Sequence, residues 1–142
     1  MFQLIYRDGA PENTGHYEGV DKDTSTEFKV GQAIYLDATG KAKKIPSANA
    51  NKVYGIVSEP ATAADECVNV LKVTPDMIFS CPVRGTAIAS LFKGQKLAID
   101  HTDAASVTSA ATTLDSAKIG VTVVEKCNAS VAGDRINVRF EN

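Results

Sequence analysis

Two stretches of this chain, residues 28–73 and 92–140, read as two copies of one β-rich unit. The first copy opens with FKVGQAIYLDATG and the second with FKGQKLAIDHTD. The aligned pairs are Gly31-Gln32 with Gly94-Gln95, Asp37 with Asp100, and Gly55 with Gly120. The spacing between aligned positions grows only in segments where loops tolerate insertions. A repeated sheet unit without a shared polar cluster favours a scaffold or binding module over a catalyst.

Within each copy, short apolar runs are separated by turn residues. In the first copy, QAIYLD is followed by the turn ATGK and by KAKKI, which predicts a hairpin. VYGIVSE, CVNVLKV and DMIFSCPV follow as strands, and KLAID, KIGVTVVEK and RINVRFE repeat this order in the second copy. This pattern predicts an all-β fold, a β-barrel or β-sandwich built from two similar β units. Residues Gly85 to Leu91 are the best place for a short helix or a crossover between the copies.

The glycines shared by the two copies have two different positions. Gly31 and Gly94 precede strands, where we expect a bend or a positive φ angle. Gly55 and Gly120 lie inside strands, where glycine is typical of a bulge or of a close backbone approach.

The first 27 residues differ in composition from the rest of the chain. GAPENTGHYEGVDKDTSTE is polar and rich in glycine, with little apolar periodicity, which predicts an extended N-terminal arm over residues 1–27. Residues 28–142 then form a single β-rich domain. The apolar start with Phe2, Leu4, Ile5 and Tyr6 could form a strand that anchors the arm. The remainder of the arm is either a free tail or a segment that becomes ordered against a partner.

Composition excludes several classes of protein. The chain has 142 residues, 44% of them hydrophobic, and a net charge of −2, which gives no general attraction for nucleic acid or anionic lipid. No apolar run approaches the roughly 20 residues of a membrane helix, and the start lacks the pattern of a signal peptide. We therefore expect synthesis in the cytoplasm, no nucleic-acid partner and no membrane partner. The three cysteines have no spacing typical of disulfide or zinc sites, so we expect buried thiols.

The strongest enzyme-like cluster is Asp100-His101-Thr102-Asp103, which could supply a base and its orienting carboxylate in a small hydrolase. Its counterpart in the first copy, residues 37–40, is a plain hairpin turn, so we interpret both as turns that bond their own backbone. Asp21 and Asp23 match only part of a calcium loop. Phosphate-loop, dinucleotide-binding and nucleophile-elbow motifs are missing. We expect no catalytic residues, no metal site and no cofactor.

Three segments in order, MIFSCPVRGTAI, FKGQKLAID and AKIGVTVVEKCNASVAGDRINVRF, resemble the small β-rich capsid cement or head decoration proteins of tailed bacteriophages. The resemblance extends over residues 28–142 and is clearest over 77–140. It implies a virion structural protein on the outer capsid surface, which stabilises the expanded head by bridging neighbouring capsomers. It also implies the major capsid protein as partner and a homotrimer as the assembled form.

The strongest alternative is a receptor- or glycan-binding β-module of a phage tail or fibre. Such a module would need an exposed aromatic platform, whereas the chain has no tryptophan and four tyrosines, two of them in predicted strands. For the cement role, polarity and the lack of core periodicity single out four residues of the arm as capsid contacts: Arg7, His16, Tyr17 and Glu18.

Overall fold

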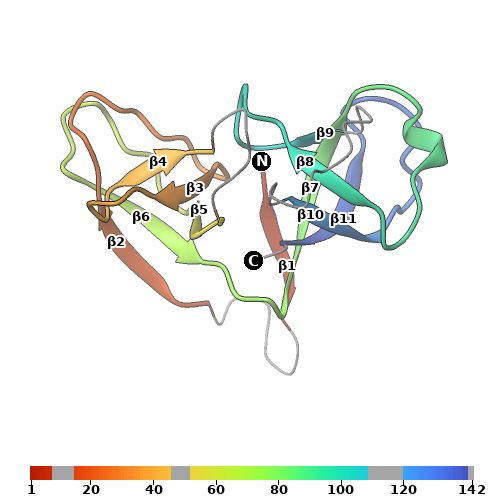
Figure 1. The fold of residues 1–142 in the computed structure, drawn as a ribbon, viewed down its shortest axis with the longest axis horizontal. Coiled ribbons are helices and arrows are strands. Elements are labelled where there is room, and N and C mark those ends of the chain that lie inside the picture. Colours follow the sequence, from red (N-terminus) through yellow and green to blue (C-terminus); the bar gives the residue numbers. More distant parts are fainter. Residues whose placement is uncertain (8–14, 46–51, 109–119, 141–142) are drawn as a thin grey trace.

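The computed structural model describes residues 1–7, 15–45, 52–108 and 120–140. The strands are β1 (Gln3–Arg7), β2 (Tyr17–Asp21), β3 (Ala33–Leu36), β4 (Ala42–Lys44), β5 (Gly55–Val57), β6 (Cys67–Lys72), β7 (Met77–Arg84), β8 (Lys96–Ile99), β9 (Val107–Thr108), β10 (Val121–Glu125) and β11 (Arg135–Phe140). The 3₁₀ helix η1 (Ile88–Ser90) confirms the short helix predicted between the copies. Figure 1 shows β2 to β6 on one side and β7 to β11 on the other, with β1 between them. We call residues 17–72 unit 1 and residues 77–140 unit 2.

Unit 2 is a closed five-stranded barrel. Its strands are arranged in the order β7-β11-β10-β8-β9, and β9 then pairs in parallel with β7, Val107 lying opposite Val83. This last pairing joins the two edges of the sheet, so that the barrel has no open edge there. β1 pairs antiparallel with β7 and adds a sixth strand outside the barrel.

Unit 1 repeats this arrangement strand for strand. Its order is β2-β6-β5-β3-β4, and a parallel bridge between Lys22 and Ala42 connects the end of β2 to β4. Thus β2 corresponds to β7, β6 to β11, β5 to β10, β3 to β8 and β4 to β9. The predicted all-β class and the two similar β units are confirmed.

The Gly-Gln turn before β3 and β8 is built by the same hydrogen bonds in both units. The Gly31 N–H donates to the Val57 carbonyl at 2.8 Å, and the Gly94 N–H donates to the Val123 carbonyl at 2.8 Å. Each valine N–H donates in return to the carbonyl of the glutamine that follows the glycine, at 2.9 Å. Gly31 and Gly94 have φ angles of 81° and 90°, which confirms the predicted positive φ.

Hydrogen bonds also correct the alignment at the start of the two copies, where the sequence sets Phe28 against Phe92. In unit 1 the glutamine side chain of the turn accepts from the Lys29 N–H, and in unit 2 the equivalent side chain accepts from the Phe92 N–H. Phe92 therefore corresponds to Lys29, and the counterpart of the buried Phe28 is the buried Leu91. The physical reason is that the glutamine, three residues after its donor, fixes the register of the turn.

The main hydrophobic core draws side chains from β1 and from both units. Within it, the centroid of the Phe140 ring lies 5.0 Å from that of Phe2 and 5.2 Å from that of Phe79. Ile56 and Leu71 of unit 1 belong to the same cluster. A second cluster, which includes Phe28, fills unit 1 alone. The larger cluster shows that the two units share a core.

Residues 1–27, for which the sequence predicts an extended arm, contain both β1 and β2. The strand expected from Phe2 to Tyr6 is confirmed as β1, and Phe2 is buried in the main core. β2 pairs with β6 from Tyr17 to Asp21, and its Val20 faces the core of unit 1. These pairings tie both segments to the sheets.

The three cysteines have different surroundings. Cys81 of β7 is buried as predicted, and desolvation by burial raises the pKa of its thiol to about 12. Cys67 and Cys127 are exposed, so the expectation of buried thiols is wrong for these two. Cys67 opens β6 at its solvent end, and Cys127 lies in a turn after β10, where neither side chain can reach a core.

Candidate binding surface

The four residues predicted to contact a partner lie at the end of β1 and around the start of β2. Arg7 ends β1, where its backbone pairs with Met77, and its side chain lies outside the described part of the structure. His16 directly precedes β2, and Tyr17 and Glu18 begin it. The structure places His16 and Glu18 in direct contact, whereas no described contact joins Arg7 to them.

Glu18 is held on the outside of unit 1 by two side chains. His16 Nε2 lies 3.1 Å from one carboxylate oxygen, and the Tyr54 hydroxyl donates to the other. The Tyr54 bond is the main reason that the pKa of Glu18 lies below its usual value, and the same bond raises the pKa of Tyr54. The Lys72 ammonium lies 5.5 Å from the centre of the Tyr54 ring. These contacts give the start of β2 a fixed polar surface.

An apolar groove of about 420 Å³ lies beside this polar surface. One wall is β1 with the N-terminal Met1, and the other includes Tyr17 and Val30 of unit 1. Ile56 and Phe79, which belong to the main core, also line it. Among the described lining residues there is no aspartate, glutamate, lysine or arginine side chain. The groove can therefore accept an apolar group.

An acidic hollow adjoins the groove. It shares Tyr17 and Ser58 with the groove and also contains Glu18 and Glu59. The Asn69 amide donates to the Glu59 carboxylate at 2.7 Å, which fixes the side chain of Glu59. Lysine and arginine are missing from the described lining, so the hollow favours a cationic neighbour.

Asp100-His101-Thr102-Asp103 forms a turn, as predicted from its counterpart in the first copy. Asp100 accepts from the Thr102 N–H at 2.9 Å and from its hydroxyl at 2.7 Å, and Asp37 accepts from Thr39 in the same way, at 2.8 and 2.7 Å. Asp103 bonds to Ser106 and pairs with Arg84, not with His101. These carboxylates bond locally, and the arrangement does not assemble a base with its orienting carboxylate.

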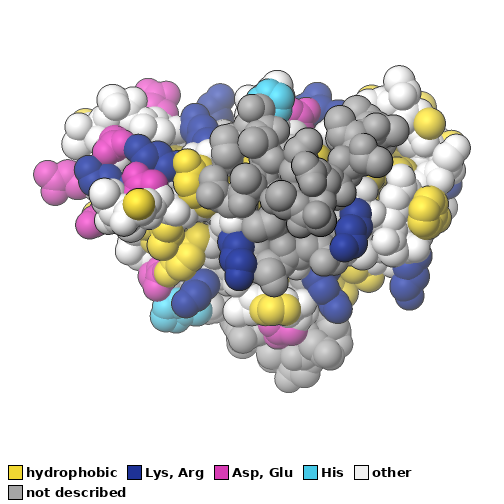
Figure 2. All heavy atoms as spheres, viewed as in Figure 1, with side chains coloured by type: hydrophobic (Ala, Val, Ile, Leu, Met, Phe, Trp, Pro, Cys, Tyr) yellow, Lys and Arg dark blue, Asp and Glu magenta, His cyan; other side chains and the backbone are white. Residues whose placement is uncertain are grey.

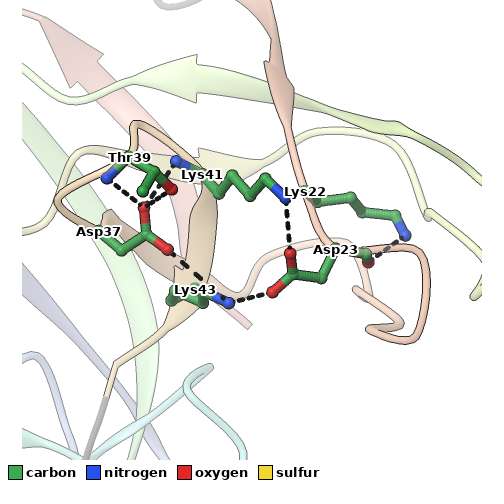
Figure 3. A network of polar contacts seen from close by, with 6 residues as sticks. All are labelled: Lys22, Asp23, Asp37, Thr39, Lys41 and Lys43. Atoms are coloured by element: carbon green, nitrogen blue, oxygen red, sulfur yellow. Dashed lines mark hydrogen bonds and ion pairs between the residues drawn. The ribbon is translucent and has the colours of Figure 1, made fainter.

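Asp23, half of the partial calcium loop, is instead the centre of an ion-pair network (Figure 3). Its carboxylate accepts from the Lys41 ammonium at 2.9 Å and from the Lys43 ammonium on its other oxygen. Lys43 also lies 3.8 Å from a carboxylate oxygen of Asp37. The Lys43 bond, followed by the Lys41 bond, lowers the pKa of Asp23 to about 2. We call Asp23, Lys41 and Lys43 the clasp, because they join the end of β2 to the hairpin of β3 and β4.

The described residues contain no group of three or more potential metal-binding side chains. In the same part of the chain, no helix has the length and hydrophobicity needed to cross a membrane.

Comparison with known proteins identifies a family. Residues 7–73 match the family model described as phage cement protein. This segment, just under half of the chain, is therefore similar to the phage cement protein family. The matched segment covers the end of β1 and all of β2 to β6, and so includes the polar surface and the unit 1 side of the groove. No curated protein matches the chain.

The family match indicates a structural role in the phage capsid and, with it, a place in the virion. Cement proteins are structural components rather than enzymes. The match does not favour the alternative of a receptor- or glycan-binding module.

Sequence reasoning missed the groove and its main residues, Met1 and Val30. Val30 lies in the Gly-Gln turn before β3, and β1 is brought against this turn only in the folded chain, where the Phe2 N–H donates to the Gly31 carbonyl at 3.0 Å. One signal was available in the sequence. In the corrected alignment, Val30 stands where the second copy has Lys93, which marks a position at which the two copies differ in polarity.

Proposed function

We propose that this cement protein binds the outer surface of the expanded phage head and stabilises it by bridging neighbouring capsomers. Its partner is the major capsid protein, and it acts as a homotrimer. The observation that carries the proposal is the family match over residues 7–73. The duplicated β unit supports it, since both copies retain the residues that shape a sheet and neither retains a reactive set.

The proposed mechanism is an added binding free energy at capsomer junctions. Packaged DNA strains the shell where capsomers meet, and a bound module must be released before they separate. Two backbone-directed bonds couple the units of the cement protein: Ala33 N–H to the Ala104 carbonyl at 2.6 Å, and the Gln32 amide to the Asp103 carbonyl at 2.9 Å. Together with the shared core, they make a rigid body that loses little conformational entropy on binding.

The residues we propose for the capsid contact are Arg7, His16, Tyr17 and Glu18. The His16 side chain is 68% exposed, so it is available to a partner. Tyr17 and Glu18 border the groove and the acidic hollow, so in this proposal they contact whatever occupies them. All four lie inside or beside strands that carry core residues, so point substitutions test them better than truncation does.

Co-sedimentation of the purified full chain with expanded, undecorated capsids tests the proposal. We expect saturable binding and a higher temperature of DNA release from decorated heads. Absence of binding would overturn the capsid role. Unexpanded capsids serve as the control for recognition of the mature lattice.

The His16 contact has a matched control in the exposed His101 of unit 2. His16→Ala should weaken capsid binding by about fivefold, a typical loss of about 1 kcal/mol for one interface side chain. His101→Ala should bind as the wild type does. If the two variants bind equally, His16 is not a contact.

A further inference from the structure

The described residues include five large hydrophobic side chains that are exposed, three at the groove and two on loops of unit 2. Met1, Tyr17 and Val30, exposed by 49%, 53% and 42%, line the groove. Phe92 and Val131, exposed by 62% and 61%, lie in the loop before β8 and the loop between β10 and β11. Figure 1 shows these two loops at the side of unit 2 that faces away from unit 1. We call Phe92 and Val131 the tip.

The two loops that carry the tip are held together. The Lys126 ammonium, from the loop between β10 and β11, donates to the Ala89 carbonyl of η1 at 2.6 Å. In Figure 2, hydrophobic side chains are visible at the margin of the molecule on the unit 2 side. The tip therefore presents exposed apolar side chains on two loops that are tied to each other.

Unit 1 shows that the fold does not require apolar residues at the tip. Phe92 occupies the position of Lys29, as the bonds of the Gly-Gln turn establish. The Val131 N–H donates to Asp134 at 3.1 Å, just as the Thr62 N–H donates to the loop aspartate of unit 1 at 2.6 Å. Unit 1 thus has exposed polar residues at both positions. Exposed apolar side chains that do not serve the fold indicate a contact surface.

The polarity of the two Gly-Gln turns is reversed. Unit 1 has Lys29-Val30 where unit 2 has Phe92-Lys93, so the apolar residue faces the groove in one unit and forms the tip in the other. Lysines lie near the tip in addition to Asp134, and glutamates lie next to the groove. Lys93 follows Phe92 and Lys126 lies in the loop of Val131, whereas the hollow that adjoins the groove contains Glu18 and Glu59.

We propose that the tip of one copy inserts into the groove of a second copy, so that the cement protein associates head to tail. Phe92 and Val131 would leave water in the apolar groove, and Lys93 would face the acidic hollow. Since the tip and the groove are different surfaces, the contact is heterologous and can close into a ring such as a trimer. This inference rests on the proposed function and names the surfaces through which cement copies meet.

Sedimentation velocity of the full chain over a range of concentrations tests the contact. We expect the wild type to associate with rising concentration. Phe92→Lys removes the tip, and Val30→Lys places a charge in the groove. Each variant carries the residue found at the equivalent position of the other unit, so the turn accommodates it. Each should weaken association by at least about tenfold, the effect of losing one buried large apolar side chain.

Mixing the two variants gives the sharpest test. Phe92→Lys retains an intact groove, and Val30→Lys retains an intact tip. Mixed in equal amounts, they should form a one-to-one dimer that grows no further, although each is monomeric alone at that concentration. A mixture that stays monomeric overturns the head-to-tail contact.

Two further variants guard against misfolding and nonspecific effects. Val131→Thr, which installs the unit 1 residue, should weaken association without loss of far-ultraviolet circular dichroism. Lys29→Ser, at the unit 1 position that corresponds to Phe92, should associate as the wild type does. If Phe92→Lys and Val131→Thr both associate as strongly as the wild type, the tip is not the contact surface.

Capsid binding separates this inference from the proposed function. A wild type that co-sediments with capsids but stays monomeric at every concentration overturns the tip-in-groove contact and leaves the capsid role intact. In that case we would expect a segment of the capsid protein to bind in the groove. A wild type that associates but does not bind capsids overturns the proposed function instead, and the contact between copies stands.

Discussion

At the scale of single residues, two strand glycines of unit 1 have different tolerances for a side chain. A Cβ atom on Gly55 would lie 2.9 Å from the Leu71 carbonyl oxygen and 3.0 Å from a methyl carbon of Val70. These atoms belong to the paired strand β6, whose backbone cannot move away. A Cβ on Gly19 would meet only the Asn69 side chain, at 3.5 Å. The close approach predicted for Gly55 is therefore confirmed.

Gly55→Ala should destabilise the protein by about 1–3 kcal/mol, as expected when a well-packed site must take an extra methyl group. Gly19→Ala should be neutral or stabilising by about 0.5 kcal/mol, because alanine restricts the unfolded chain and meets no close atom. Urea unfolding followed by circular dichroism measures both. Equal effects of the two substitutions would contradict the steric explanation.

At the scale of the elements, each unit is closed by a parallel pairing that an ion pair accompanies. In unit 1 the clasp lies next to the bridge between Lys22 and Ala42. In unit 2 Arg84, at the end of β7, lies 3.3 Å from an oxygen of Asp103. The pairs involve different residues, so the repeated requirement is closure of the sheet rather than a particular side chain.

The clasp should make stability depend on acidity. The pKa of Asp23 is lowered by Lys43 and Lys41 from its ordinary 3.8 to about 2 in the folded state. The carboxylate thus stabilises the fold at pH values above the unfolded pKa, and this contribution is lost as the pH falls through the folded pKa. Asp23→Asn should lower the melting temperature at neutral pH and flatten its decline between about pH 4 and pH 2.

Thermal melts of both proteins across this range measure the effect. Because the clasp is partly exposed, high salt should reduce the difference between the wild type and Asp23→Asn at neutral pH. If the melting temperatures of the wild type and Asp23→Asn differ by the same amount at every pH, the clasp is not the contact that titrates.

At the scale of the whole molecule, Gln32 connects the two units. Its amide accepts from the Lys29 N–H at 2.8 Å and donates to the Asp103 carbonyl of unit 2 at 2.9 Å. Gln95 makes the equivalent turn bond, accepting from the Phe92 N–H at 3.2 Å. Both glutamines therefore make the same bond within their turn, and Gln32 makes an additional bond to the other unit.

Gln32→Ala should destabilise the protein by about 1–3 kcal/mol, because two partly buried hydrogen bonds to the backbone are lost. Gln95→Ala, at a more exposed position, should cost less. Chemical unfolding of both variants measures the difference. A greater loss for Gln95→Ala would show that the turn, and not the coupling of the units, determines the cost.

Sequence alone determined the β class, the duplication, the turns and the absence of a recognisable catalytic motif. These features are local: alternating apolar residues, Asp-x-Thr turns and glycines before strands fix the elements wherever they lie in space. For this reason the hairpin of β3 and β4, the short helix η1 and the positive φ of Gly31 and Gly94 were all predictable. The matched family is the one that the sequence resembles, but the match lies over residues 7–73 and not over residues 77–140, where the resemblance is clearest.

Only the tertiary structure decided how the repeat begins, how each sheet closes and where apolar surface remains exposed. Each closure pairs strands that are not neighbours in sequence, and the groove forms because β1 crosses from unit 2 to the Gly31 turn of unit 1. The exposure of Phe92 depends on the same kind of information. In the sequence it resembles the buried Phe28, but the register that the glutamine imposes in the folded turn places it in solvent.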